Sequence, residues 1–326
     1  MYSQIRIRLL WQAICLNIIL SACSIGTAAS IQVPLWTLEA DSIQASFQEP
    51  VWHSDVASYQ AAVTTSPIPP EQASPVWTDV GVTTSFYLGS LELLNGLDYH
   101  VHVRATLQDD SIQFVGTSPP IKAVQPVATI GEAKGFPDNT WLAVNQKKIS
   151  KNASPFLFYI QEPDRSSGIM VYDSAGSLAT SELISGRLIS IAGRLARLNN
   201  TLCLYDPLIS VGTLADAPLP VYVRNHQAGG SPFAYLPPPT EQGERGASWG
   251  SGLNNMSLLI RTSGRVLESI PGFRMRITDG STLQPLVVWL PFGETSLQVG
   301  DYVEVVGHTD TTGIRLLSPR SWIKLN

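Results

Sequence analysis

Short runs of alternating apolar and polar residues dominate the chain after its first forty residues. The clearest runs are 42–47, 59–63 and 99–105, where successive side chains fall on opposite faces of an extended strand. Pro-rich segments and the Asn95-Gly96 pair separate these runs and are typical of turns. No long segment after residue 30 carries apolar residues at helical spacing. The pattern therefore predicts an all-β protein with many short strands joined by turns.

The region 31–123 shows this pattern in the form of an antiparallel sandwich. Its strand at 99–105 places Tyr99, Val101 and Val103 on one face, and we expect the opposite face, with two His and one Arg, to be solvated. The stretch "LELLNGLDYHVHVRA" at 91–105 resembles the fibronectin type III signature, and "VWTDVGVTTSFYL" at 76–88 is similar to the form found in secreted bacterial proteins. Phe47 stands where that family often has Trp, so we expect it to anchor the core. The resemblance implies a fibronectin type III domain over 31–123.

The region 127–326 contains an internal repeat. Phe158 and Phe273 each precede an Asp by six residues, and two Gly seven residues apart follow in both copies. The strands between those glycines also match in phase. We interpret this as a tandem duplication of one β-module. The matched positions are Phe158, Asp164, Gly186, Gly193, Leu204 and Pro207 in the first copy and Phe273, Asp279, Gly300, Gly307, Leu316 and Pro319 in the second.

Each copy has about five expected strands, which favours a small closed barrel. The segments "FYIQEPDRSSGIMV" (158–171) and "GLNNMSLLIRTSGRV" (252–266) resemble OB-fold modules of large secreted bacterial surface proteins. The resemblance implies OB-fold-like modules at 127–223 and 256–326. A Pro- and Gly-rich segment at 224–255 is expected to be a linker or long loop. Its aromatic residues Phe233, Tyr235 and Trp249 either pack onto a barrel, which is the preferred interpretation, or are exposed for stacking.

The N-terminus has the order of an export signal. Arg6 and Arg8 precede an apolar stretch at 9–20 that is too short for a membrane span, and small residues follow. Leu20-Ser21-Ala22-Cys23 resembles the lipobox of bacterial lipoproteins, which implies a signal peptide at 1–23 and an acylated Cys23 that attaches the protein to a membrane of the cell envelope. The alternative is cleavage near residues 28–30, which would give a secreted soluble protein.

Cysteine content and charge narrow the range of partners. Once Cys15 leaves with the signal and Cys23 is acylated, Cys203 has no cysteine to pair with, so the fold is not held by disulfides. Residues 24–123 carry two basic against ten acidic residues, whereas residues 124–326 carry 17 Lys and Arg against 16 Asp and Glu. The chain therefore lacks the strong basic field expected of a tight nucleic-acid binder.

Catalytic motifs are absent from the sequence. Its five His occur in no metalloprotease pattern, and no nucleophile motif is present. His100 and His102 share a strand face, but two ligands do not make a zinc site, so no metal or other cofactor is expected. Asp164 and Asp279 occupy turns, where Asp usually accepts backbone hydrogen bonds. The sequence therefore predicts a protein that is not an enzyme.

The best candidate for a binding surface lies on the second barrel. If Phe273, Met275 and Ile277 point inward, Arg274 and Arg276 point outward together. Two residues of the neighbouring strand, Arg261 and Arg265, would extend that patch, while the matching positions of the first barrel are Tyr159 and Gln161.

Three functions follow from this organisation. The preferred hypothesis is a non-enzymatic cell-surface protein of the bacterial envelope that acts in binding or adhesion to a surface protein or another ligand. The first alternative is single-stranded nucleic-acid binding by the barrels, which predicts an affinity that falls steeply with salt. The second alternative is an oligosaccharide-binding accessory of the envelope, which predicts weak salt dependence and aromatic stacking.

Overall fold

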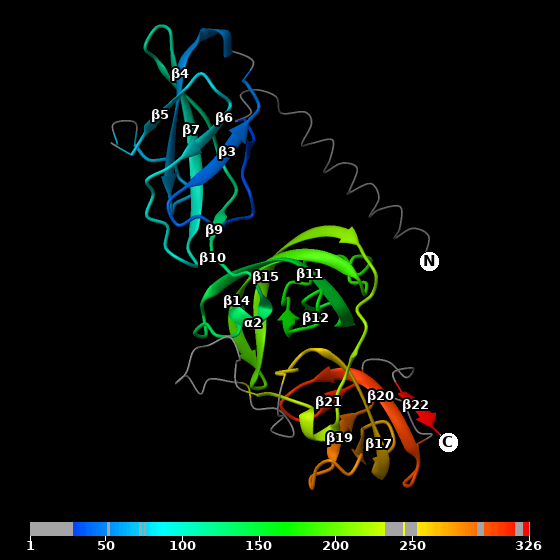
Figure 1. Ribbon diagram of the computed structural model, residues 1–326. Coiled ribbons are helices and arrows are strands. Elements are labelled where there is room, and N and C mark those ends of the chain that lie inside the picture. The colour runs from blue at the N-terminus through cyan, green and yellow to red at the C-terminus, as the bar shows by residue number, and fades with distance from the viewer. Residues whose placement is uncertain are drawn as a thin grey trace, which may run out of the picture. The chain divides into compact units, whose positions relative to one another are not determined.

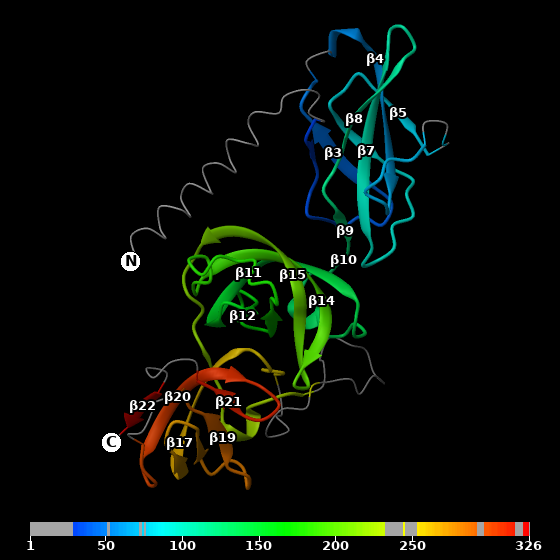
Figure 2. The same ribbon diagram turned by 180° about the vertical axis from the view of Figure 1, so that it is seen from behind.

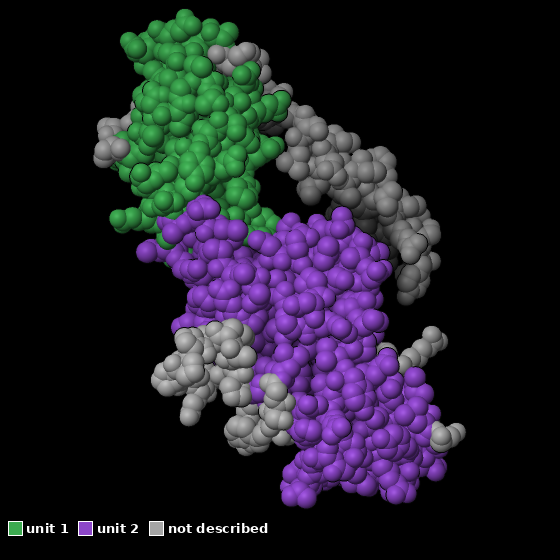
Figure 3. All heavy atoms as spheres, viewed as in Figure 1, with its two compact units in different colours: residues 1–37, 41–93, 97–122 green, residues 38–40, 94–96, 123–326 purple. Residues whose placement is uncertain are grey.

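The computed structural model describes residues 29–50, 53–71, 74, 76–231, 244, 253–291, 297–316 and 322–325. The chain forms two compact units, residues 1–37, 41–93 and 97–122 in one and residues 38–40, 94–96 and 123–326 in the other (Figure 3). The expected signal peptide with Cys23, and the three aromatic residues of the expected linker, lie outside the described residues. Within the described part of the chain, no helix is long and apolar enough to cross a membrane.

The first unit is a sandwich of two sheets. One sheet has the order β1-β3-β6, and the other has the order β2-β9-β7-β4-β5 with β8 also on β7 (Figure 1). This is the arrangement of a fibronectin type III domain, in which the chain passes from one sheet to the other between β5 and β6. The strands are β1 (Ile31–Gln32), β2 (Trp36–Thr37), β3 (Ile43–Phe47), β4 (Val56–Thr64), β5 (Thr78–Gly81), β6 (Ser85–Leu88), β7 (Asp98–Leu107), β8 (Ile112–Thr117) and β9 (Ile121–Ala123), with a 3-10 turn η1 (His53–Asp55) before β4.

An aromatic cluster forms the centre of the sandwich. The ring of Phe47 meets the ring of Tyr59 edge-on, with centroids 4.9 Å apart, and the ring of Phe86 lies 6.2 Å away. All three side chains are buried, as are Val101 and Val103 of β7. Phe47 therefore anchors the core as expected at the position where the family often has Trp.

The opposite face of β7 is not solvated, which corrects the expectation from the sequence. The His102 side chain is 0% exposed, and its ring nitrogens bond to the hydroxyls of Thr64 and Thr117, each 2.9 Å away. Arg104 is also buried, and its guanidinium lies over the Trp77 ring, 4.2 Å from the centroid. Neighbouring side chains satisfy the polar groups of His102 and Arg104. Alternation therefore located the strand correctly but did not predict that its second face is buried.

The second unit contains two closed barrels, each with five main strands. The first barrel has the order β11-β12-β13-β15-β14 and closes through β11 and β14; the second has the order β17-β18-β19-β21-β20 and closes through β17 and β20 (Figures 1 and 2). In both, the third and fifth strands are parallel. This order is that of the OB fold. The strands are β11 (Trp141–Ser154), β12 (Leu157–Gln161), β13 (Gly168–Tyr172), β14 (Arg187–Leu198), β15 (Thr201–Leu214), β17 (Leu259–Ile270), β18 (Arg274–Thr278), β19 (Leu286–Trp289), β20 (Tyr302–Thr309) and β21 (Ile314–Arg315).

Short elements precede or extend each barrel. A two-residue strand pairs in parallel with the first strand of each barrel, and a single helical turn follows it in both. These are β10 (Gln125–Pro126) with α2 (Ile130–Ala133), and β16 (Val221–Tyr222) with η2 (Asn225–Gln227); β22 (Trp322–Leu325) adds to β20. Val223 and Ala228 belong to the apolar core of the second barrel. The structure thus includes 221–231 in the second barrel, whose expected start was residue 256.

Equivalent glycines confirm the internal repeat. Gly193 lies opposite Leu142 of β11, and Gly307 lies opposite Ile260 of β17. A Cβ on Gly307 would come within 2.4 Å of the Arg315 carbonyl oxygen, because the neighbouring strand crosses closely there. The other pair, Gly186 and Gly300, adopts positive φ angles of 93° and 98° just before the fourth strand of each barrel.

The register of the second strand differs by two residues from the alignment expected from the sequence. Ile160 pairs with Ile149, and Ile277 pairs with the equivalent Val266, so Ile160 matches Ile277. Met275 and Ile277 point inward as expected, but Phe273 precedes the strand and is 52% exposed. The matching Phe-to-Asp spacing was coincidental, because the apolar side chains that fill the barrel, rather than the aromatic residue, set the register.

The revised register explains the acidic residues. The Glu162 carboxylate accepts a hydrogen bond of 2.6 Å from the Ile130 backbone N–H, and the equivalent Asp279 accepts one of 3.0 Å from the Asn225 N–H. Each therefore fixes the helical turn that precedes its barrel. Asp164 and Asp279 also accept backbone hydrogen bonds within their own turns, from Ser166 and Ser281, which confirms the expectation of a structural role.

Candidate functional site

OB barrels bind ligands on the outer face of their second and third strands and on the adjoining loops. In the second barrel this face is formed by β18 and β19 together with β21. Side chains alternate along β18, so that Met275 and Ile277 fill the barrel while Arg274 and Arg276 lie outside. The face therefore presents polar and aromatic groups to solvent over a fully buried apolar core.

Two adjacent aromatic rings lie between two arginine side chains on this face. The guanidinium of Arg315 lies over the Trp289 ring, 5.8 Å from its centroid; the Trp289 and Phe273 rings meet edge-on at 5.3 Å; and the guanidinium of Arg274 lies 6.0 Å from the Phe273 centroid. We call these four residues the aromatic–arginine ladder. Flat side chains that follow one another in space in this way are suited to stacking on successive rings of an extended ligand.

The loop between β20 and β21 holds one end of the ladder in place. The Trp289 indole N–H donates a hydrogen bond of 2.9 Å to the Thr312 hydroxyl, which in turn donates one of 2.6 Å to an Asp310 carboxylate oxygen. The other Asp310 oxygen accepts from the Arg315 guanidinium. One carboxylate thus orients both an aromatic ring and an arginine, which reduces the conformational freedom that a ligand would have to remove.

The arginines of this face are paired with carboxylates. Glu268 forms ion pairs with both Arg274 (3.1 Å) and Arg276 (3.6 Å), and Asp310 pairs with Arg315. All these side chains are partly exposed, so the pairs contribute little to stability but offset much of the positive charge. Three arginines face two carboxylates, which leaves a weakly positive surface.

The other two arginines named from the sequence are directed elsewhere. Arg261 forms an ion pair of 3.5 Å with Glu304 of β20, and the Arg265 side chain donates a hydrogen bond of 3.4 Å to the Gly300 carbonyl. The structure therefore brings Arg274 and Arg276 together on one carboxylate and turns Arg261 and Arg265 toward β20 and the loop before it.

The corresponding face of the first barrel is covered by the second barrel. Tyr159 is only 3% exposed, and its ring stacks on His308 of β20, with centroids 4.1 Å apart and 14° between the planes. Tyr159, Met170 and Cys203 form a small buried apolar cluster on the outside of the barrel. Between this cluster and the β20–β21 loop lies a pocket of about 360 Å³, to which Arg315 also contributes.

Gln161 is completely buried beside this contact, which corrects its expected exposure. Its amide oxygen and nitrogen have no hydrogen-bond partner among the described residues. The neighbouring Gly168 explains the burial, because a Cβ at that position would come within 2.6 Å of the Ser257 carbonyl oxygen of the second barrel. Tyr159 and Gln161 therefore belong to the contact between the barrels and not to an open ligand surface.

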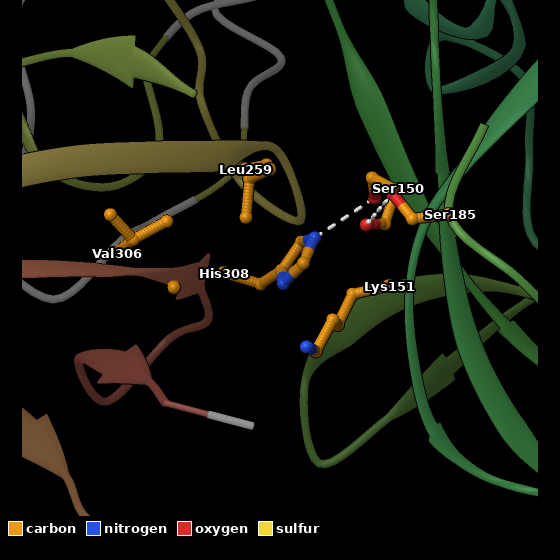
Figure 4. Close-up of a pocket in the computed structure, with 7 residues that line it drawn as sticks. Ser150, Lys151, Ser185, Leu259, Val306 and His308 are labelled. Atoms are coloured by element: carbon orange, nitrogen blue, oxygen red, sulfur yellow. Dashed lines mark hydrogen bonds between the residues drawn. The ribbon is translucent and has the colours of Figure 1, made fainter. Parts of the chain in front are cut away.

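Three further polar interactions join the first barrel to Glu244 and to the second barrel. The Lys134 ammonium forms a 2.8 Å ion pair with Glu244 and also donates to the Met256 carbonyl, with both charged side chains almost completely buried. His308 Nε2 lies 2.9 Å from the Ser150 hydroxyl of the first barrel, as Figure 4 shows. A buried charge pair and a buried histidine therefore both lie within this contact.

Burial shifts the pKa values of the groups in this interface. Removal from water raises the pKa of Tyr159 to about 12 and lowers the pKa of His308 to about 3, with the nearby Lys151 ammonium adding to the second effect. Burial also raises the pKa of the Cys203 thiol to about 11, so this free cysteine is a poor nucleophile at neutral pH. These shifts reflect packing and not an acid–base pair.

Among the described residues, no group of three or more His, Cys, Asp or Glu side chains is placed to hold a metal ion. The His100 and His102 rings lie 6.5 Å apart, and both are engaged in hydrogen bonds within the sandwich.

Sequence reasoning missed three of the four ladder residues. It placed Phe273 inside the barrel and did not select Trp289 or Arg315, which come from the third and fifth strands. The available signal was the OB strand order itself, since the outward positions of strands two, three and five share one face once the register is known.

Comparisons with known proteins add no family assignment. No family model and no curated protein matches the sequence. Among solved structures, the chain is similar to the chicken CNTN1 FN1-FN3 domains, with 11% identity over 91% of this chain and 96% of that one and a TM-score of 0.22. It is also similar to the Yersinia enterocolitica family 28 exopolygalacturonase, with 17% identity over 34% of this chain and 23% of that one and a TM-score of 0.22. The fold described above rests on strand order, not on these low similarities.

Proposed function

We propose that the protein is a non-enzymatic binding protein of the bacterial cell envelope that binds an oligosaccharide on the aromatic–arginine ladder of its second barrel. The observation that carries this proposal is the ladder itself, in which Arg315, Trp289, Phe273 and Arg274 follow one another at 5.3 to 6.0 Å across the open OB face. Export and attachment through an acylated Cys23 are supported by the N-terminal sequence, and the fibronectin type III domain would serve as a spacer.

The charge of the face favours a sugar over a polyphosphate. Every arginine on it already has a carboxylate partner, from Glu268 or Asp310, so a phosphate would have to compete for the guanidinium. Nucleic-acid affinity depends on several unpaired Lys or Arg side chains that release counterions. Stacking of aromatic and guanidinium planes on sugar rings needs no such excess charge.

Single-stranded nucleic acid is the second candidate because aromatic and arginine side chains lie next to one another on this face. Bases stack on aromatic rings in a sequence-tolerant manner, and arginine contacts add to this. The two candidates differ in salt dependence. Nucleic-acid binding should weaken markedly between about 50 mM and about 200 mM salt, whereas stacking on a neutral sugar should change little.

A binding titration of the full chain tests the proposal. The probes are a neutral N-acetylglucosamine oligomer, an acidic galacturonate oligomer and single-stranded oligothymidine, each labelled for fluorescence anisotropy at both salt concentrations. We expect saccharide binding that falls about tenfold in Trp289→Ala, which corresponds to a loss of about 1.4 kcal/mol for one aromatic contact. The control is Leu283→Ala, which removes a fully exposed apolar side chain of the same barrel.

The outcomes separate the candidates. Oligothymidine binding that weakens with salt and in an Arg274→Ala/Arg276→Ala variant would replace the sugar with nucleic acid. Binding that is equal in Trp289→Ala and Leu283→Ala would show that the ladder is not the ligand face.

A further inference from the structure

A second pocket lies between the two barrels. It has a volume of about 190 Å³ and is lined by polar residues of the first barrel and by β20 and β17 of the second (Figure 4). Ser150, Lys151 and Ser185 come from the first barrel, and Leu259 and His308 from the second. This pocket shares no residue with the aromatic–arginine ladder and is therefore a separate candidate site.

The hydrogen bonds of Ser150 favour one tautomer of His308. The Ser150 hydroxyl has one proton, which it donates to the Tyr159 carbonyl at 3.2 Å. It therefore accepts from His308 Nε2 at 2.9 Å, so that Nε2 carries the imidazole proton. The other ring nitrogen, Nδ1, is then a bare acceptor. It is buried, in a side chain that is 1% exposed, and has no hydrogen-bond partner among the described residues.

A positive charge accompanies this acceptor. The Lys151 side chain lines the same pocket, and Figure 4 shows it extending beside the His308 ring, near the ring edge that faces away from Ser150. Within the described part of the chain, its ammonium has no ion-pair partner, and it acts on His308 electrostatically. A buried acceptor without a donor is costly, at about 1–3 kcal/mol, so the pair of groups calls for a ligand that satisfies both.

Only some ligands meet both demands. Nδ1 requires an O–H or N–H donor, and the ammonium requires an anionic oxygen within the same small molecule. Monohydrogen phosphate and phosphate monoesters that keep one proton carry both groups. Sulfate has the same shape and is anionic, but it has no proton to donate at neutral pH. The geometry points to a phosphate site in this pocket, in which Lys151 binds an anionic oxygen and His308 Nδ1 accepts the P–OH proton as a hydrogen bond.

Calorimetric titration of the full chain at pH 7 and constant ionic strength tests this assignment. The probes are inorganic phosphate, glycerol phosphate and sulfate, where the second shows whether the site accepts an ester. We expect phosphate to bind at least about tenfold more tightly than sulfate, because sulfate would leave Nδ1 unpaired. Lys151→Met should lower the phosphate affinity by about tenfold or more. The matched control is Lys148→Met, a partly buried lysine of the same strand that does not line the pocket.

Three results would overturn the assignment: no phosphate binding, equal affinity for phosphate and sulfate, or equal effects of Lys151→Met and Lys148→Met. The second of these would indicate an adventitious ion only. Should Lys151→Met fail to fold, nitrogen NMR of the His308 ring in the unmodified chain provides the readout. The Nδ1 resonance should shift on phosphate addition and stay unchanged with sulfate, and an unchanged resonance in both would also refute the site. Failure of saccharide binding to the ladder has no bearing on this test.

Discussion

The two barrels share strand order, equivalent glycines and an acidic residue, Glu162 or Asp279, that binds the helical turn before the barrel. Their outer faces nevertheless differ. In the first barrel, the face of β12 and β13 presents Tyr159 and Met170, and the second barrel covers it. In the second barrel, the same face presents Arg274 and Phe273 and stays open. A duplicated OB module has thus given one copy that serves as a docking surface for its neighbour and one that keeps an exposed face.

The difference follows from the chemistry of the outward side chains. Tyr159, Met170 and Cys203 are apolar enough to gain free energy from burial, at about 25 cal/mol per Å² of apolar surface. The charged groups Arg274, Arg276 and Glu268 would lose hydration if covered, and pair with one another at the surface instead. Two copies of one module can therefore diverge in role through a few outward positions while their inward positions still specify the same barrel.

The sharpest test exchanges an aromatic residue on each face for alanine. Tyr159→Ala should lower the free energy of unfolding by about 3–5 kcal/mol, because it empties a buried aromatic site between the barrels. Phe273→Ala should cost less than about 1 kcal/mol, since half of that side chain is already exposed, while it weakens ligand binding. Urea unfolding of both variants measures the contrast. Equal losses of stability in the two variants would contradict the description of the first face as covered and the second as open.

The equivalent glycines offer a second comparison, with a smaller effect. A Cβ on Gly307 would meet the Arg315 carbonyl oxygen at 2.4 Å, whereas one on Gly193 would meet the Leu204 Cβ at 3.1 Å. Gly307→Ala should therefore destabilise the protein by about 1–3 kcal/mol and Gly193→Ala by clearly less, because backbone yields less easily than a side chain. Thermal unfolding of the two variants checks the order, and a larger effect at Gly193 would contradict it.

Acidification should destabilise the covered face of the first barrel through His308, and this is the smallest of the three expected effects. Burial lowers the pKa of His308 to about 3 from 6.5, so between these values the unfolded chain binds a proton that the folded chain does not. Stability should therefore fall by about 1 kcal/mol for each pH unit below 6.5 and be independent of this group above it.

A variant isolates the contribution of His308 to this pH dependence. The pKa of His102 in the sandwich is also lowered by burial, so it acts in the same window. The difference between the unmodified chain and His308→Gln, in urea unfolding from about pH 7 to pH 5, reports His308 alone. Parallel curves for the two proteins would show that His308 does not stay neutral in the folded state.

Much of the architecture was predictable because strand formation and turns are local. Alternation at 99–105 located β7, the sandwich fold followed from the "LELLNGLDYHVHVRA" stretch, and the repeated glycines identified two modules. The same local pattern misjudged the register of β18, because Phe273 is as apolar as the residues that fill the barrel. Alternation shows which residues share a face, but not which faces meet.

The sequence by itself determined the all-β fold, the duplication and the presence of Arg274 and Arg276 on one outward face. Only the tertiary structure decided that Tyr159 and Gln161 lie beneath the second barrel and that Trp289 and Arg315 complete the ladder. The reason is distance along the chain. Ser150 meets His308 across more than 150 positions, and the outward side chains of β18, β19 and β21 come together only when the barrel closes.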